Sequence, residues 1–145
     1  MAKSTTKTIP SKTGKLLEVR EFVASEARDF GFSDEDISKI ALAVDEACTN
    51  IIRHAYQNDP DREIAITVEK KKDRLEVSIV DDGRKFDPSM LKPLNLKEHL
   101  TRYRRGGLGV YLMKTLMDKV EYNSLGDKRN EVRLTKYLHP VRSRQ

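Results

Sequence analysis

Apolar residues recur at helical spacing over two stretches in the first half of the chain. Residues 13–30 place apolar side chains three or four positions apart, and Gly31 follows as a helix stop. Ser33 is a typical N-cap, and the three acids after it would lie in the first turn, where the helix dipole favours them. A second apolar stripe then predicts a long helix that ends near Tyr56.

The hydrophobic period changes to two beyond a turn at residues 58–61. Residues 63–69 and 74–80 each alternate apolar and polar side chains, and the charged segment 70–73 between them reverses the chain. Residues 3–9 alternate more weakly and predict an edge strand. Alternation of this kind is typical of antiparallel strands that bury one face.

The second half of the chain holds a long polar segment, a third helix and two more strands. The polar, basic segment from 84 to about 105 is long for a loop in a compact domain, and such loops are often functional. A helix is predicted over 108–118, with strands at 120–122 and 132–136. This order of elements predicts an α+β fold in which helices cover one face of a sheet.

The composition fits one domain that works inside the cell. A chain of 145 residues is enough for one domain with its own core. No apolar run approaches the ~18 residues of a membrane span, and the N-terminus lacks the apolar region of a secretory signal. Cys48 lies on the apolar helix face and is interpreted as a buried thiol in a reducing compartment. We therefore expect a cytoplasmic protein without membrane contact.

The positive charge is concentrated in one segment. The net charge is +5, and residues 84–106 contain seven Lys and Arg residues against two acids. Such an excess suits a phosphate ligand or an acidic protein surface as well as it suits DNA.

The long helix also presents a polar row. Glu46, Asn50 and His54 follow one another at i, i+4 and i+8, opposite the apolar stripe. An acid, an amide and an imidazole in one row would suit the activation of a hydroxyl beside a metal-bound phosphate. A solvated polar face is the simpler interpretation of this row taken alone.

Two glycine motifs extend the candidate site. In Asp81-Asp82-Gly83, at a strand end, a buried carboxylate would accept a hydrogen bond from an adenine amino group, and Gly83 would let the base approach. Gly107-Leu108-Gly109 lies at a helix start, where backbone N–H groups suit phosphate. Each motif alone is more typical of a simple turn. Their order and spacing, with the basic segment between them, are much more specific.

Together these motifs resemble the ATPase domain shared by gyrase, histidine kinases and MutL. The chain is most similar to the small anti-sigma factor serine kinases of the RsbW and SpoIIAB type. The matching segments are 45–54 (the N box), 80–88 (the first glycine box) and 105–112 followed by 116–118 (the second glycine box). The resemblance spans about residues 10–138. It implies a single domain over 1–145, a two-layer α/β sandwich of the Bergerat type with helices on one face of a mixed, mostly antiparallel sheet.

The resemblance also implies roles for individual residues. Glu46 would be the general base, Asn50 the Mg²⁺ ligand and Asp81 the adenine-binding acid, with Gly83 near the base. Residues 84–106 would form a lid over ATP. The remaining nucleotide contacts would come from Arg105, Gly107, Leu108 and Gly109. One departure is that Lys85 stands where the first glycine box often has its second glycine.

The function implied is an ATP-dependent protein serine/threonine kinase that is also an anti-sigma factor. Its substrate would be a STAS-type anti-anti-sigma protein, its sequestered partner a sigma factor, and homodimers are common in the family. One alternative is an ATP-holding binding module without kinase activity, which Glu46 and Asn50 disfavour and Lys85 leaves open. The other alternative, a nucleic-acid-binding domain, would need exposed aromatics among the basic residues, and only Tyr103 fits. We therefore expect no direct nucleic-acid contact.

Overall fold

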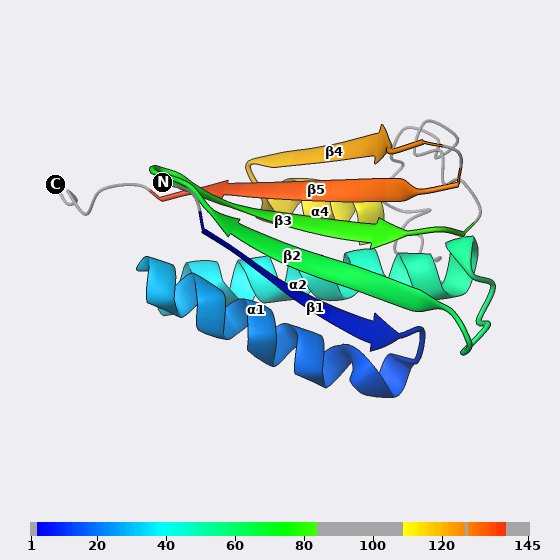
Figure 1. Ribbon diagram of the computed structural model, residues 1–145. Coiled ribbons are helices and arrows are strands. Elements are labelled where there is room, and N and C mark those ends of the chain that lie inside the picture. Colours follow the sequence, from blue (N-terminus) through cyan, green and yellow to red (C-terminus); the bar gives the residue numbers. More distant parts are fainter. Residues whose placement is uncertain (1–2, 84–108, 127, 139–145) are drawn as a thin grey trace, which may run out of the picture.

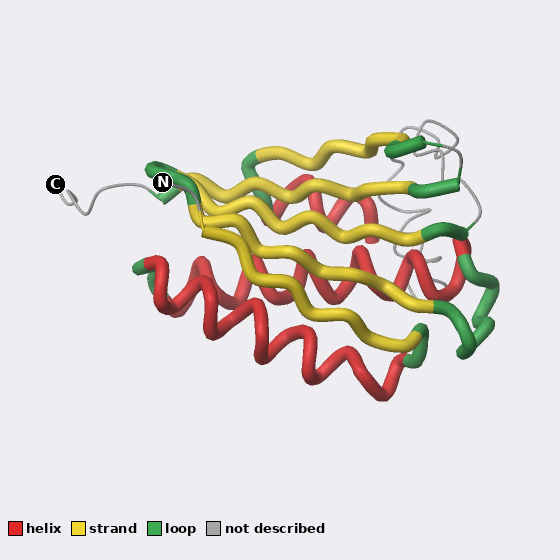
Figure 2. Tube along the Cα trace, in the orientation of Figure 1, coloured by secondary structure: helices red, strands yellow, loops and turns green. Residues whose placement is uncertain are grey.

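The computed structural model describes residues 3–83, 109–126 and 128–138. The expected lid, 84–106, lies outside the described residues, together with the site candidates Arg105, Gly107 and Leu108. Helices and strands form two layers, with the helices on one face of the sheet, as Figures 1 and 2 show. The expected two-layer α+β class is therefore confirmed.

Two paired helices make most of the helical layer. A 3-10 turn, η1 (Thr13–Lys15), leads into α1 (Leu16–Phe30), which ends at Gly31 with the left-handed φ of 110° that favours glycine. Helix α2 (Asp34–Asn50) starts at Ser33, whose hydroxyl accepts a hydrogen bond from the Asp36 amide at 3.2 Å. The helix stop and the N-cap are both as the sequence predicts.

The long second helix changes its winding near its end. After Asn50 it continues as a π-helical turn, η2 (Ile51–Ala55), and the Tyr56 amide donates to the Ile51 carbonyl at 2.8 Å, an i→i+5 bond. The repeat of about 3.6 residues that aligned His54 with the row therefore ends at Asn50. The apolar pattern did not predict this change, since the apolar side chains of η2 are buried in the same core.

The sheet has five strands in the described part of the chain. Their order is β1-β2-β3-β5-β4, and every pairing between them is antiparallel. The sheet, expected to be mixed and mostly antiparallel, is therefore antiparallel throughout this part. The strands are β1 (Lys3–Pro10), β2 (Glu63–Lys70), β3 (Arg74–Asp81), β4 (Lys119–Ser124) and β5 (Asn130–Tyr137). Helix α4 (Gly109–Leu116) precedes β4 and packs beside α2.

The core lies between the two layers. The strand side chains that were predicted to point inward are all buried at 1% exposure or less: Ile64, Ile66, Val68, Leu75, Val77 and Ile79. Met113 and Met117 bring α4 into the same core, and Cys48 is a fully buried thiol, as expected. No helix in the described ranges is long and apolar enough to cross a membrane.

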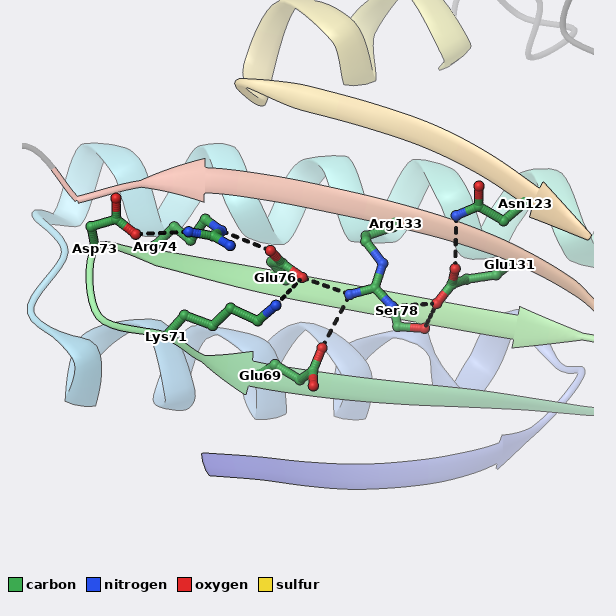
Figure 3. A network of polar contacts seen from close by, with 9 residues as sticks. All are labelled: Glu69, Lys71, Asp73, Arg74, Glu76, Ser78, Asn123, Glu131 and Arg133. Carbon is green, nitrogen blue, oxygen red and sulfur yellow. Dashed lines mark hydrogen bonds and ion pairs between the residues drawn. The ribbon is translucent and has the colours of Figure 1, made fainter. Parts of the chain in front are cut away.

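The opposite face of the sheet carries a network of charged and polar side chains (Figure 3). At its centre the Arg133 guanidinium donates to carboxylates on three strands, at 3.1 Å to Glu69, 2.6 Å to Glu76 and 2.9 Å to Glu131. Glu76 and Glu131 are 7% and 5% exposed because the long basic side chains cover them. The strand alternation predicted a polar outer face but not this degree of burial.

Candidate functional site

The candidate residues gather because several elements meet at one end of the sheet. Strand β3 finishes there and β2 starts there, since Val80 pairs with Ala65. The chain reaches β2 directly from η2, so the end of the long helix lies at this end too. Strand β4 runs parallel to β3, because both pair antiparallel with β5. Helix α4 leads into the start of β4 at the far end, so its first residue, Gly109, faces the end where β3 finishes (Figure 1).

Asp81 is a buried carboxylate at the last position of β3. Its side chain is on the helix-facing side of the sheet, and the residue is 5% exposed. Oδ1 accepts hydrogen bonds from the Gly83 amide at 2.8 Å and from Asn130 Nδ2 at 3.1 Å. Within the described residues no donor reaches Oδ2. This oxygen is therefore suited to accept a hydrogen bond from the amino group of a base.

Burial also affects the ionisation of Asp81. Desolvation raises the pKa of Asp81 above its usual value, and the donors Asn130 and Gly83 offset part of that rise. Burial of this charged carboxylate therefore lowers the stability of the ligand-free protein. A buried acceptor of this kind is typical of a recognition site rather than of a stabilising ion pair.

Asn130 is a site residue that the sequence analysis missed. It is the first residue of β5, pairs with Asp81 across the sheet, and its amide also donates to the Gly83 carbonyl at 3.1 Å. Asn130 therefore holds both ends of the Asp81–Gly83 turn. In the sequence it lies between the predicted strands 120–122 and 132–136, and only the strand register reveals its partner.

Gly83 has a steric reason to be glycine. A Cβ at this position would lie 2.5 Å from the Ala55 carbonyl oxygen and 2.6 Å from Tyr56 Cδ1. Real Cβ atoms do not approach backbone atoms so closely, so the turn after β3 fits against η2 only without a side chain. This close contact joins the strand that carries Asp81 to the helix that carries Glu46 and Asn50.

Glu46 and Asn50 lie one turn apart near the end of α2, and both are half-buried. Asn50 precedes Ala55, the contact of Gly83, by five residues, which are the π-helical turn η2. Glu46 lies four residues before Asn50, about 6 Å along the axis of α2. His54 falls in the π-helical turn and is exposed, so it does not continue the row with regular spacing.

The environment of Glu46 favours a stronger base than an ordinary carboxylate. Desolvation raises the pKa of Glu46, the neighbouring charge of Asp45 raises it further, and Arg53 lowers it in part. Asp45 is itself held by Arg20 of α1 through a 2.6 Å ion pair. A carboxylate with a raised pKa suits a general base, because its proton affinity lies closer to neutral pH.

The residues also fit a nucleotide with a divalent ion. No group of three or more His, Cys, Asp or Glu side chains that could hold a metal occurs among the residues that the structure describes. Mg²⁺ does not need such a cage, since it is usually held by one or two protein oxygens, waters and substrate phosphates. The half-buried amide of Asn50 would supply one oxygen, and the N-terminus of α4 at Gly109 would face the phosphates.

Comparison with known proteins agrees with this geometry. A family model described as the histidine kinase-like ATPase domain matches residues 9–136, which is most of the chain. The chain thus belongs to this class of ATPase domain, and its fold is that of the class.

Named relatives narrow the class further. The chain is 37% identical to the serine-protein kinase RsbW of a strain of Bacillus cereus over 134 residues, which cover 90% of this chain and 82% of that protein. The same figures hold for the serine-protein kinase RsbW of Bacillus thuringiensis subsp. konkukian. The chain therefore belongs to the RsbW family of serine-protein kinases, with the histidine kinase-like ATPase fold.

A solved structure supports the fold. The crystal structure of the RsbU and RsbW domains of Rv1364c from Mycobacterium tuberculosis superposes with a TM-score of 0.65 at 16% identity. The match covers 97% of this chain and 34% of that longer chain. At this identity the likeness concerns the fold alone.

Proposed function

We propose that this protein uses ATP to phosphorylate a serine or threonine of a STAS-type anti-anti-sigma protein and that it sequesters a sigma factor. The observation that carries the proposal is the meeting of three features at one end of the sheet. These are the buried, clamped Asp81, the half-buried Glu46 with its raised pKa, and the N-terminus of α4. Family membership supports the kinase activity, and the resemblance to anti-sigma factors supports the partners.

Each residue has a defined task in the proposed reaction. Asp81 Oδ2 accepts a hydrogen bond from the adenine amino group, and Gly83 lies close to the base. Asn50 would supply an oxygen ligand to Mg²⁺, and the resemblance to the family assigns the remaining nucleotide contacts to Arg105, Gly107, Leu108 and Gly109. When bound, ATP would supply the phosphoryl group, and Mg²⁺ would neutralise part of its negative charge.

Glu46 is the general base of the proposal. It takes the proton from the substrate hydroxyl as the hydroxyl oxygen bonds to the γ-phosphorus, the bond to the β-phosphate breaks and ADP leaves. A positioned base of this kind typically contributes ~10²–10⁴-fold in rate.

The ATP-holding module remains the second candidate function because Lys85 occupies a glycine position of the first glycine box. Both candidates bind ATP, and both allow a homodimer. They differ only in whether Glu46 takes part in chemistry.

Replacement of Glu46 by Gln separates the two candidates. Gln keeps the shape and hydrogen bonding of Glu but cannot take up the proton. Phosphate transfer from labelled ATP to the STAS-type partner should fall by ~10²-fold or more, while ATP binding in a parallel titration survives. Asn50→Ala should weaken Mg²⁺-dependent ATP binding as well as transfer.

The matched control is Glu35→Gln, an exposed position at the start of the same helix. It should leave binding and transfer unchanged. Transfer by Glu46→Gln at the wild-type rate would remove Glu46 as the base. Absence of transfer by the wild type, with ATP bound, would make the binding module the better account.

A further inference from the structure

A second cluster of side chains surrounds the Asp81–Gly83 turn and has no part in the proposed chemistry. Tyr56 follows η2 and is 4% exposed. Its hydroxyl accepts a hydrogen bond from the Asp82 amide at 3.1 Å, and the Glu63 carbonyl and Asp82 Oδ1 lie within reach of its proton. One hydroxyl thus joins the end of the long helix, the start of β2 and the end of β3.

Arg62 completes this cluster from the solvent side. Its guanidinium lies over the Tyr56 ring, 4.8 Å from the centroid, and donates to both the carbonyl and the carboxylate of Asp82, at 2.9 and 2.8 Å. Asp82 is therefore held through its amide, its carbonyl and its side chain. Gly83, the next residue, packs against the Tyr56 ring.

The protonation states that these contacts require are kept at physiological pH. Burial is the main cause that raises the pKa of the Tyr56 phenol, so its proton remains available to an acceptor. The hydrogen bond from Arg62 lowers the pKa of Asp82, so this carboxylate stays charged. Neither Tyr56 nor Asp82 therefore changes its protonation state near neutral pH.

We propose that Tyr56, Arg62 and Asp82 form a latch that fixes the turn on which Asp81 recognises the nucleotide. Tyr56 and Arg62 are positioning residues, since they hold the main chain on either side of the turn and leave the ligand to Asp81. The inference rests on the proposed function for the identity of the ligand. Its structural part, that the latch holds the turn, stands on the contacts alone.

The latch predicts a separation of affinity from turnover. Tyr56→Phe keeps the ring, and with it the packing of Gly83 and Arg62, but removes the hydroxyl. Arg62→Gln removes the exposed clamp on Asp82 without opening the core. In both variants we expect the KM and the dissociation constant for ATP to rise about 3- to 10-fold, the range that follows from the loss of one net hydrogen bond. The kcat at saturating ATP should stay at the wild-type value, because Glu46 is untouched.

The matched control is Ser78→Ala, which removes a buried hydroxyl bonded to Glu131 on the outer face of the sheet. It should lower the melting temperature without changing the KM for ATP. If Tyr56 had a purely structural role, Tyr56→Phe would behave like Ser78→Ala. It would lower the amount of folded enzyme and leave the affinity of the folded enzyme for ATP unchanged. An unchanged KM in Tyr56→Phe and Arg62→Gln, with binding lost in Asp81→Asn, would overturn the latch and leave the proposed function intact.

Hydrogen exchange of the ligand-free protein tests the latch without ATP. The Gly83 amide donates to Asp81 and makes no bond to Tyr56, so its exchange reports how firmly the turn is held. We expect it to exchange faster in Tyr56→Phe than in the wild type and at the wild-type rate in Ser78→Ala. Unchanged exchange at Gly83 would overturn the latch, whereas failure of the wild type to bind ATP would overturn the proposed function.

Discussion

Asp81 and Gly83 have different tasks in the turn after β3. Asp81 places at the strand end a carboxylate that is buried, accepts two hydrogen bonds on Oδ1 and has a raised pKa. The glycine was expected to make room for a base. The structure adds the close approach of the Ala55 carbonyl, which requires a glycine even in the absence of a ligand.

Replacement of Gly83 by Ala should therefore destabilise the fold. The new Cβ would meet backbone atoms of η2, which cannot move aside as a side chain can. Overpacking of this kind typically costs about 1–3 kcal/mol, which lowers the melting temperature by several degrees at this size. Thermal unfolding measured by circular dichroism provides the test.

Gly14→Ala is the control for this prediction. A Cβ at Gly14 would meet nothing within 4 Å, so the melting temperature should stay the same or rise slightly. Equal stability of Gly83→Ala and Gly14→Ala would contradict the packing role of Gly83.

The residues that the sequence analysis missed are those whose partners depend on register. Asn130 contacts Asp81 because β5 pairs with β3, 49 positions away in the chain. Tyr56 contacts Asp82 because η2 ends beside the same turn. Local patterns predicted most of the elements but held no information about which residues face each other across elements.

Helices and strands themselves were largely predictable. Ser33, Gly31 and the alternation in β2 and β3 gave clear local signals, and the structure has the corresponding cap, stop and strands. The π-helical turn was not predictable, since its apolar residues continue the stripe of α2. Neither was the charged network on the outer sheet face, which needs three strands side by side.

The charged network on the outer face of the sheet predicts that the stability of the protein depends on pH. Burial would raise the pKa of Glu76, but its bonds to Arg74, Arg133 and Lys71 outweigh burial and lower the pKa to about 2. A depressed folded-state pKa stabilises the protein above the unfolded value and loses that stabilisation as the pH falls from about 4.5 toward 2. Full protonation should cost on the order of 3 kcal/mol.

Denaturant unfolding of the wild type and Glu76→Gln between pH 7 and pH 3 measures this contribution. The wild type should be more stable at pH 7, and the difference should shrink toward pH 3. Glu35→Gln, which removes an exposed i,i+4 pair, should differ little from the wild type at either pH. A constant difference between wild type and Glu76→Gln across this range would refute the ionic origin of the stabilisation.

The molecule as a whole has two layers, with helices on one face of the sheet, and the candidate site lies at one end of them (Figure 1). The ends of the long helix and of β3 and the start of α4 all meet there, because the antiparallel order of the sheet brings them together. The sequence predicted the individual motifs, and the resemblance to a family predicted that they converge. The topology supplies the physical reason for that convergence.

The charge distribution predicts weak binding to nucleic acid. Several basic residues in the described ranges are paired with acids, for example Lys70 with Glu26 and Arg20 with Asp45, and the unbalanced excess lies in residues 84–106. Binding to random duplex DNA at physiological salt should be no tighter than ~10⁻⁴–10⁻⁶ M, the non-specific range. Nanomolar binding with a sequence preference, in a fluorescence anisotropy titration, would contradict the account.

In the proposed function Asp81 recognises the nucleotide, and the thermal shift caused by ATP with Mg²⁺ in the wild type and in Asp81→Asn tests this role. At ~100 times the dissociation constant, ATP should stabilise the wild type by about 2.7 kcal/mol, a shift of several degrees. Asp81→Asn should melt no lower than the wild type without ligand, because it removes a carboxylate that is buried at a cost, and should lose most of the shift. A full shift in Asp81→Asn, or none in the wild type, would contradict the nucleotide site.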